Sequence, residues 1–588
     1  MDRKNRFCWN VQPKAEEKNI CKGSCYRFTV LTACLVRLEY DPSGLFEDRA
    51  SQSAFYRDFP ATPFTVQRQQ GILTLETDCL RLVYRENAPF SADSLSVQLK
   101  IEPASVWHYG DDFEDLGGTV KTLDQVNGSC PLERGVCSRN GFSVLEDSHT
   151  LVLEEDGWVG VRREGTTDAY FFGYGYDYIG AVQDFYSLTG VPPLLPAYAL
   201  GNWWSRYHAY TQQEYCDLID RFREEDIPFS VGVIDMDWHI VDIPEELQEK
   251  NIRSSSGWTG YTWNEELFPD YKAFLKYLKE RNLHTSLNLH PAVGVCRHEK
   301  MYPQMAKACG IDPATGERVK LDLLSRDFME KYFDIIHHPY EEDGVDFWWM
   351  DWQQGCDYSV VMGEDYRPNG LESVKPLWIL NHMHYLSSKR QGNRGLIFSR
   401  FGGFGSQRYP IGFSGDTLIT WRSLDFQPYF TATASNVLYG YWSHDIGGHL
   451  GDSIDPEMYT RWLQYGGFSP VMRTHSSKSG GLNKEPWVFT EEYTNVIRQT
   501  VRQRYVMAPY IYAMARKGYD EGLALCRPMY YDYPECQEAY DFRSQYMFGD
   551  DMLIAPVVKP AVDGFAEVDV WLPGGGWFEL YTGTLLKG

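Results

Sequence analysis

Residues 344–356 read GVDFWWMDWQQGC. The first part of this stretch is a nearly continuous apolar run, which is typical of a strand buried on both faces of a parallel sheet. The run ends in one carboxylate, Asp351, which is followed by Trp352 and two glutamines. A carboxylate at the end of a buried strand costs free energy unless it has a partner. Asp351 therefore either caps the following helix or serves a ligand, and this stretch alone leaves both interpretations open.

Seven other segments have the same design, an apolar run that ends in polar or aromatic residues, and most are followed by a helical pattern. One intervening helix begins with a capping box, Thr211-Gln-Gln-Glu214. Strand–helix alternation repeated eight times predicts a (β/α)8 TIM barrel, which is an α/β fold. The predicted strands are residues 198–206, 230–239, 285–291, 345–351, 395–400, 409–416, 440–445 and 470–475.

Sequence of β character flanks the predicted barrel, to which we assign residues 196–525. Residues 1–195 contain short alternating runs separated by Asp, Pro, Gly and Ser, which predicts an N-terminal β-sandwich domain. Residues 526–588 return to β character after a long helical region and predict a proximal C-terminal β-domain. We expect this last domain to be partial at Gly588.

Two segments of the N-terminal region combine glycine with acidic or aromatic residues. They are residues 109–123 (YGDDFEDLGGTVKTL) and 171–178 (FFGYGYDY). Acidic residues beside glycine usually form ordinary turns. The alternative interpretation is a loop that reaches over a neighbouring active site.

Composition excludes several classes of partner. The 56 Lys and Arg residues against 81 Asp and Glu residues give a net charge of −25, which disfavours binding to nucleic acid or to an anionic membrane. No apolar run of about 18 residues and no secretory signal are seen in the sequence, and the 13 cysteines are scattered. We therefore expect a cytoplasmic protein with reduced thiols, and a homo-oligomer is compatible with this fold. The aromatic content of 15% favours a carbohydrate ligand, because aromatic faces bind sugar rings.

The predicted strands end in polar residues that a TIM barrel brings to one rim. The active site of this fold lies at the C-terminal ends of its strands. So many charges at one rim destabilise the protein unless a ligand or function requires them. The residues concerned are Arg206, Asp235, Asp237, His290, Asp351, Arg400, Asp416, Asp445, Arg473 and His475.

Two chemistries suit this set. Asp351 and Asp416 follow the fourth and sixth strands, and paired carboxylates are typical of glycoside hydrolysis. A separation of about 5–5.5 Å between them implies retention of anomeric configuration, and about 6.5–9.5 Å implies inversion. The rival is a metal site. Its potential ligands are Asp235, Asp237, His290, Asp445 and His475. No HExxH spacing is present, and the two arginines oppose a cation, so we predict no metal and no other cofactor.

The chain from residue 198 to residue 557 resembles glycoside hydrolase family 31, the α-glucosidase and α-xylosidase family of clan D. Trp349-Met-Asp351-Trp-Gln-Gln354 is similar to the family's nucleophile motif W-x-D-M-N-E. Arg400 followed by Phe413-Ser-Gly-Asp416-Thr417 is similar to its acid/base motif R-x(n)-W-x-G-D-N. Further matches, in order, are residues 234–238 with D-I-D-Y, 443–448 with G-A-D-I-x-G-F, 470–475 with F-x-R-N-H, and 545–557 with the start of the C-terminal β-domain.

The resemblance implies a retaining double displacement. Asp351 would be the nucleophile, which forms a covalent glycosyl intermediate, and Asp416 would be the general acid/base with a raised pKa. Charged groups would bind the sugar hydroxyls, and aromatic side chains would flank the ring. The substrate-binding residues implied or inferred are Asp235, Asp237, Trp349, Trp352, Arg400, Phe413, Asp445, Arg473 and His475.

The sequence departs from the family motifs next to both positions implied to be catalytic, so the resemblance is to a divergent member of the family. Trp352 and two glutamines replace M-N-E, Phe413 replaces the usual Trp, and Thr417 replaces the usual Asn. We expect an exo-acting α-glycosidase that releases terminal α-glucose from an oligosaccharide or α-glycoside. An α-galactosidase, an α-N-acetylgalactosaminidase or a transglycosylase of the same family is the alternative. An inactive carbohydrate-binding protein is the alternative from another class.

Overall fold

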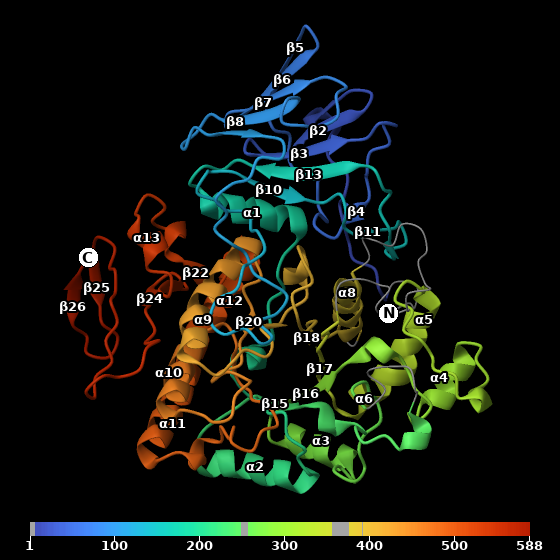
Figure 1. The fold of residues 1–588 in the computed structure, drawn as a ribbon, viewed down its shortest axis with the longest axis vertical. Helices are drawn as coiled ribbons and strands as arrows, with labels where there is room; N and C mark the ends of the chain where they lie inside the picture. The colour runs from blue at the N-terminus through green and yellow to red at the C-terminus, as the bar shows by residue number, and fades with distance from the viewer. Residues whose placement is uncertain (1–5, 249–256, 355–374, 391) are drawn as a thin grey trace.

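The computed structural model describes residues 6–248, 257–354, 375–390 and 392–588. Its centre is a parallel barrel, with antiparallel sheets of the N-terminal region on one side and a small C-terminal β-unit on another (Figure 1). The predicted fold class, a TIM barrel flanked by two β-rich parts, is confirmed. Within the described residues, no helix combines the length and the hydrophobicity that a membrane span requires.

Each predicted barrel segment contains one strand. All eight strands are parallel and hydrogen-bonded in chain order, and the last strand pairs with the first one. An isolated bridge between Ile446 and Thr474 brings the two remaining edges together, so the barrel is nearly closed. The strands are β14 (Asn202–Trp204), β15 (Val231–Ile234), β16 (His284–Leu289), β17 (Phe347–Met350), β18 (Phe398–Ser399), β19 (Gly412–Phe413), β20 (Trp442–Ser443) and β21 (Met472–Thr474).

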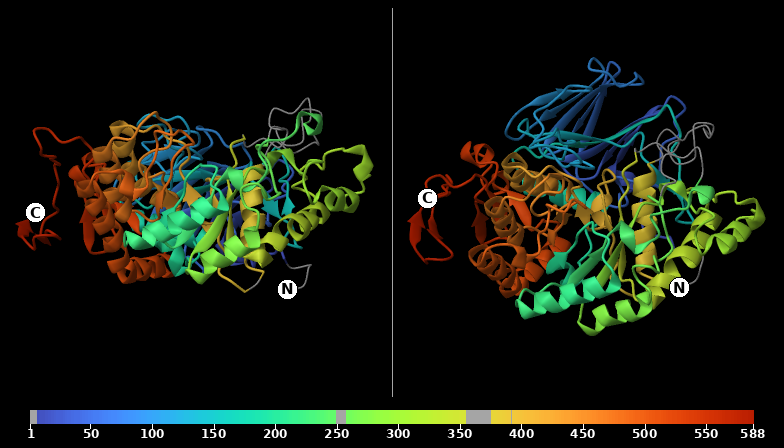
Figure 2. Two further views of the ribbon diagram at one scale, coloured as in Figure 1. Left: turned by 90° about the horizontal axis from the view of Figure 1, so that it is seen from below. Right: turned by 60° about the horizontal axis from the view of Figure 1, so that its bottom comes forward.

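Helices surround the barrel (Figures 1 and 2). The connection from β16 to β17 carries three short helices, and the connection from β18 to β19 has only the 3-10 turn Ser406–Arg408. Two long helices follow β21, as the sequence predicted. The helices are α2 (Gln212–Glu224), α3 (Tyr271–Glu280), α4 (Tyr302–Ala308), α5 (Arg326–Tyr332), α6 (His338–Asp343), α8 (Pro376–Ser388), α9 (Trp421–Thr433), α10 (Pro456–Gly467), α11 (Glu491–Val506) and α12 (Ala508–Glu521).

Helix α2 shows how local sequence sets these elements. The predicted capping box is present: the Thr211 side chain accepts from the Glu214 backbone N–H, and the Glu214 side chain accepts from the Thr211 backbone N–H. The buried face consists of Tyr215, Leu218, Ile219 and Phe222, which pack toward the barrel. The remaining positions are mostly charged and face solvent.

The N-terminal region forms the predicted sandwich. One sheet has the order β1-β2-β3-β13-β10, the other runs β5-β6-β7-β8-β9, and their facing side chains share one apolar core. Helix α1 (Tyr178–Thr189) follows the first sheet and lies between that sheet and the barrel (Figure 1). The sheet strands are β1 (Ile20–Lys22), β2 (Tyr26–Val30), β3 (Leu35–Tyr40), β5 (Thr65–Gln69), β6 (Ile72–Glu76), β7 (Leu80–Arg85), β8 (Leu95–Leu99), β9 (Val106–His108), β10 (Ser143–Glu146) and β13 (Thr167–Phe172).

Smaller sheets complete the fold. A three-stranded sheet of β4 (Ala50–Ser51), β11 (Val152–Leu153) and β12 (Val159–Gly160) joins the sandwich to the barrel core. The C-terminal unit contains the sheet β22 (Cys526–Pro528), β23 (Tyr546–Phe548) and β24 (Met552–Ile554), followed by the hairpin of β25 (Gly576–Phe578) and β26 (Leu585–Lys587). The domain boundaries at residues 195 and 525 stay predictions.

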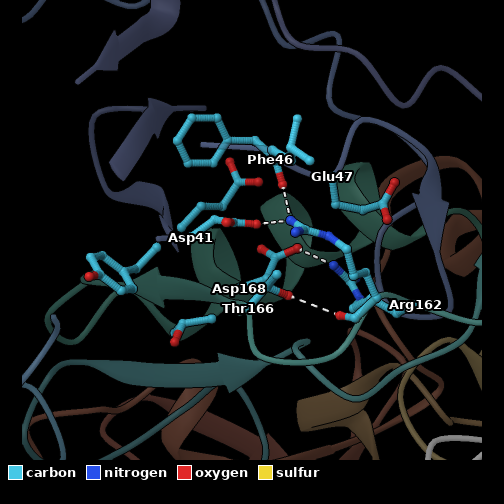
Figure 3. A pocket seen from close by; sticks show the side chains of 11 residues that line it. Asp41, Phe46, Glu47, Arg162, Thr166 and Asp168 are labelled. Atoms are coloured by element: carbon cyan, nitrogen blue, oxygen red, sulfur yellow. Dashed lines mark hydrogen bonds and ion pairs between the residues drawn. The ribbon is translucent and has the colours of Figure 1, made fainter. Parts of the chain in front are cut away.

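A buried ion network supports the sandwich. Arg37 Nη2 and Arg162 Nη1 each donate to Asp168 Oδ2 at 2.7 Å, and Arg162 Nη2 donates to Asp147 Oδ2 at 2.9 Å. Figure 3 shows the Arg162–Asp168 pair of this network beside a small cavity in the N-terminal region, which is not formed by the barrel's strand ends. Burial opposes ionisation of Asp168, yet the two guanidinium groups hold its pKa well below its usual range.

We expect Asp168→Asn to lower the free energy of unfolding by about 3–5 kcal/mol, because it leaves Arg37 and Arg162 buried without this counter-charge. Urea denaturation of full-length protein, followed by circular dichroism, measures the change. Asp520→Asn is the control, since Asp520 pairs with Arg516 on the exposed face of α12. Equal unfolding midpoints for the two variants would contradict the proposed contribution of the ion network to stability.

Candidate active site

The structure brings every predicted site residue to the C-terminal end of a barrel strand. Trp349, Phe413 and Arg473 lie within β17, β19 and β21, and the others follow their strands by one to three residues. Because all eight strands are parallel, these positions share one rim. The residues that follow a strand are Asp235, Asp237, Asp351, Trp352, Arg400, Asp416, Asp445 and His475.

Asp351 lies between a guanidinium group and an imidazole ring. Arg400 donates its Nε and Nη2 to Asp351 Oδ1 at 3.0 and 2.8 Å, and His290 Nε2 lies 3.3 Å from Asp351 Oδ2. Arg400 is fully buried, and Asp351 has an exposed fraction of 6%. Burial alone would raise the pKa of Asp351, but Arg400 and His290 hold it well below its usual range. Asp351 is therefore a carboxylate at every pH near neutrality, as a nucleophile must be.

The electrostatic environment of Asp416 shifts its pKa in the opposite direction to that of Asp351. Burial raises its pKa to about 7, and the neighbouring carboxylates Asp351, Asp124 and Asp445 add to the shift, which His449 opposes. Near neutral pH this side chain is therefore partly protonated. A carboxyl that can both give and take a proton at neutral pH is what general acid/base catalysis requires.

A loop of the N-terminal region completes the environment of Asp416. The Leu123 backbone N–H donates to the Ser414 carbonyl at 2.7 Å, and the Gln125 N–H donates to the Asp416 carbonyl at 2.9 Å. Asp124 Oδ1 accepts from the Asp416 N–H at 2.8 Å and from Arg400 Nη1 at 3.0 Å. Segment 109–123 therefore leads into a loop over the strand ends, as its second interpretation predicted. Segment 171–178 only joins β13 to α1 within the core.

Gly415 makes this approach possible. Its φ is +87°, a conformation that favours glycine, and a Cβ atom there would lie 2.3 Å from Asp124 Oδ1 and 2.6 Å from Arg400 Nη1. Glycine directly before Asp416 thus allows the N-terminal loop to contact both arginine and acid.

A second group of charges lies across the rim. Arg473 pairs with Asp445 through Nη2 and donates its Nε to Ser443 Oγ at 2.8 Å. These contacts hold the pKa of Asp445 well below its usual range although burial opposes this. The ring of His475 is fixed by Ser205 Oγ at 2.7 Å from Nδ1.

Asp235 and Asp237 differ in their partners. Asp235 Oδ2 lies 3.6 Å from His475 Nε2, and burial with the nearby Asp351 charge raises its pKa to about 8. Asp237 Oδ1 accepts from Lys478 Nζ at 3.0 Å, while its buried Oδ2 has no hydrogen-bond partner within the described part of the chain. Both carboxyl groups thus retain hydrogen-bonding capacity that the described contacts do not use.

Aromatic side chains form the wall beside Asp351. Trp349 and Phe413 meet edge to face with ring centroids 5.2 Å apart, and the Arg400 guanidinium lies 4.4 Å from the Phe413 ring. Trp352 is fully buried in the barrel core. The substrate-binding role of these aromatic residues stays a prediction.

Comparisons with known proteins agree with this geometry. Residues 192–514 match the domain described as "Glycosyl hydrolases family 31 TIM-barrel domain", and residues 522–588 match "Glycosyl hydrolase family 31 C-terminal domain". The first match covers more than half of the chain. This chain belongs to glycosyl hydrolase family 31.

Curated relatives of this family 31 chain are distant. It is 28% identical over 498 residues to an alpha-xylosidase of Saccharolobus solfataricus, which covers 81% of this chain and 64% of the relative. It is 25% identical over 484 residues to alpha-glucosidase 2 of Bacillus thermoamyloliquefaciens, covering 79% of this chain and 58% of the relative. The chain therefore spans about three fifths of the length of these relatives.

Solved structures share the fold. A family 31 alpha-xylosidase from a soil metagenome, complexed with xylose, has a TM-score of 0.74 at 18% identity and covers 97% of this chain and 94% of its own. A family 31 dextranase of Flavobacterium johnsoniae, complexed with glucose, has a TM-score of 0.75 at 21% identity and covers 97% of this chain and 76% of its own. At these identities the likeness shows the fold alone.

Two residues that contact the predicted site residues of this family 31 chain were not predicted from the sequence, namely Asp124 and His449. Asp124 comes from the N-terminal region, and no spacing along the sequence places it beside Arg400. His449 follows the stretch 443–448, in the place of the final Phe of the motif G-A-D-I-x-G-F. This replacement of Phe by His was the signal in the sequence that could have pointed to His449. His449 is buried between Asp416 and Asp445.

We expect Gly415→Ala to lower kcat/KM by about 10²-fold, because the added Cβ displaces Asp124 or Arg400 and moves the acid/base. Kinetics with an aryl α-glycoside measure the loss. Gly110→Ala is the matched control: its φ is +91°, but a Cβ there has no neighbour within 4 Å among the described residues. A Gly415→Ala enzyme as active as the Gly110→Ala enzyme would contradict the role of this contact.

We expect EDTA to change neither activity nor melting temperature. Asp445, His449 and His475 could offer converging ligand atoms, but the Arg473 guanidinium already occupies Asp445 and opposes a cation. Activity and thermal melting before and after chelation test this. Loss of activity that zinc restores would favour the metal-hydrolase alternative instead.

Proposed function

We propose that this chain is a retaining, exo-acting α-glycosidase that releases a terminal α-linked sugar. Glucose is the sugar that we propose first. The observation that carries the proposal is the opposite electrostatic environment of two carboxyl groups at one rim. Asp351 is held as a carboxylate by Arg400, and Asp416 has a pKa of about 7. Two carboxyl groups with separated pKa values define a nucleophile and an acid/base pair.

In the first half-reaction, Asp351 attacks the anomeric carbon while Asp416 transfers its proton to the leaving glycosidic oxygen. The C–O bond of the substrate breaks, and an ester bond to Asp351 forms. Arg400 keeps Asp351 ionised and oriented before attack. The carboxylate that Asp416 becomes is then the base for the second half-reaction.

In the second half-reaction, Asp416 takes a proton from water, and the resulting hydroxide attacks the anomeric carbon from the face that the aglycone left. The ester to Asp351 breaks, and the sugar leaves with its original configuration. A transglycosylase would differ only in admitting a sugar hydroxyl in place of water.

Buried polar side chains at the rim support an exo-acting site for one sugar. Asp235, Asp445 and His475 are buried at the rim, and their polar atoms suit the hydroxyl groups of a terminal residue. The names of the relatives, alpha-xylosidase and alpha-glucosidase, support a neutral α-linked sugar. Trp352 and Phe413 replace the Met and the Trp of the family motifs near the two carboxyl groups. Because these replacements can change which sugar fits, galactose and N-acetylgalactosamine are the alternatives to glucose.

We expect Asp351→Ala and Asp416→Ala to lower kcat by several orders of magnitude at unchanged melting temperature. A panel of p-nitrophenyl α-glycosides of glucose, galactose, xylose and N-acetylgalactosamine identifies the sugar, and NMR of the first product shows whether its anomer is α. Asp346→Asn is the control, because Asp346 lies at the opposite end of β17 and pairs with His284.

Full activity in either alanine variant would overturn the assignment, and a β-anomer as first product would replace retention by inversion. Sugar binding without release from any of these glycosides would favour the inactive carbohydrate-binding protein.

A further inference from the structure

His449 is a buried histidine to which the mechanism above gives no task. Its Nδ1 lies 3.4 Å from Asp445 Oδ2, and its Nε2 lies 3.7 Å from Asp416 Oδ1. The side chain has an exposed fraction of 8%. One imidazole thus connects the acid/base with a carboxylate at the sugar-binding floor.

The position of this ring is fixed from several sides. The His449 backbone N–H donates to the Thr417 carbonyl at 2.9 Å, which ties it to the residue after Asp416. The buried Lys484 ammonium donates to the carbonyls of Ile446 and Gly448 at 2.7 and 2.6 Å, just before the ring. The imidazole stacks on that of His475 with centroids 4.9 Å apart and an interplanar angle of 28°. These contacts hold the backbone on both sides of His449 and one face of its ring.

The charges around the two stacked rings favour one cation. Burial lowers the pKa of both imidazoles, but contacts with Asp445 and Asp416 raise that of His449 above its ordinary value, whereas that of His475 stays well below. One charged and one neutral ring avoid mutual repulsion. The titratable and charged groups that face His449 are Asp235, Asp416, Asp445, His475, Arg473 and Lys484.

We propose that His449 is a positioning residue whose imidazolium, held by Asp445, stabilises the carboxylate that Asp416 becomes after it donates its proton. The inference rests on the proposed function, and it makes Asp416, His449 and Asp445 one chain of alternating charge. The imidazolium keeps its own proton throughout, so the proton that reaches the leaving oxygen comes from Asp416 alone. A fixed cation at this distance favours both proton release in the first half-reaction and an ionised base in the second.

The proposal predicts how removal of the His449 imidazolium changes the pH dependence of kcat/KM. The activity kcat/KM requires protonated Asp416 in the free enzyme, so it falls as the pH rises through the pKa of Asp416. An adjacent cation lowers that pKa, since it favours the charged carboxylate. Removal of the cation therefore raises the pKa and moves the alkaline limb to higher pH.

The test compares His449→Phe and His449→Gln with wild type in full pH profiles of kcat/KM. We expect the alkaline limb to move up by about one pH unit in both variants. A glycosyl fluoride, whose departure needs little acid assistance, should show a much flatter alkaline limb in all three enzymes. His444→Phe is the matched control: His444 is equally buried, its ring nitrogens have no hydrogen-bond partner among the described residues, and it packs against Tyr465.

Alkaline limbs that coincide with the wild-type limb in both His449 variants would overturn the inference, while the losses in Asp351→Ala and Asp416→Ala would still stand. Wild-type enzyme without activity on any glycoside would remove the proposed function itself. If neither variant folds, histidine NMR of the wild-type protein decides: the inference requires a buried imidazole that is still protonated at pH 7, and only neutral buried imidazoles would overturn it.

Discussion

The guanidinium group of Arg400 is the interaction on which the site depends. Two of its nitrogens donate to Asp351, and the third donates to Asp124 of the N-terminal region. A planar fork with donors on several sides suits this task, which a lysine could not perform. Since Arg400 is fully buried, each partner compensates for the cost of removing the charge from water. The same contacts orient Asp351 and anchor the loop that reaches Asp416.

The charge of one arginine also explains why the pKa values of Asp351 and Asp416 shift in opposite directions. Asp351 contacts Arg400 and His290 directly, so it stays ionised despite burial. Asp416 has the carboxylates Asp351, Asp124 and Asp445 around it, which raise its pKa, and His449 opposes them. The difference lies in the neighbours and not in the residue type, because both residues are aspartates at the same rim. A barrel rim built from many strand ends can supply such different neighbours within one site.

The N-terminal region is part of the catalytic environment. Its buried Arg37–Asp168–Arg162 network stabilises the sandwich, and its loop from Leu123 to Gln125 forms backbone hydrogen bonds with the segment that carries Asp416. Gly415 permits this contact because any Cβ there would meet Asp124 and Arg400. The barrel therefore provides both carboxyl groups of the proposed mechanism, Asp351 and Asp416, while the environment of Asp416 includes a side chain from another part of the chain.

The sequence by itself determined the barrel and the family. Strand ends carry the barrel's site residues, so an apolar run followed by Asp351, or a glycine followed by Asp416, could be recognised locally. The register of eight parallel strands then placed these residues at one rim, as expected. Only the tertiary structure decided the partners of each charge. Asp124 is 276 residues from Arg400, and His449 reaches Asp416 across two barrel loops, so no local pattern encodes either contact. Ionisation depends on such contacts and on burial, and both arise only when the chain has folded.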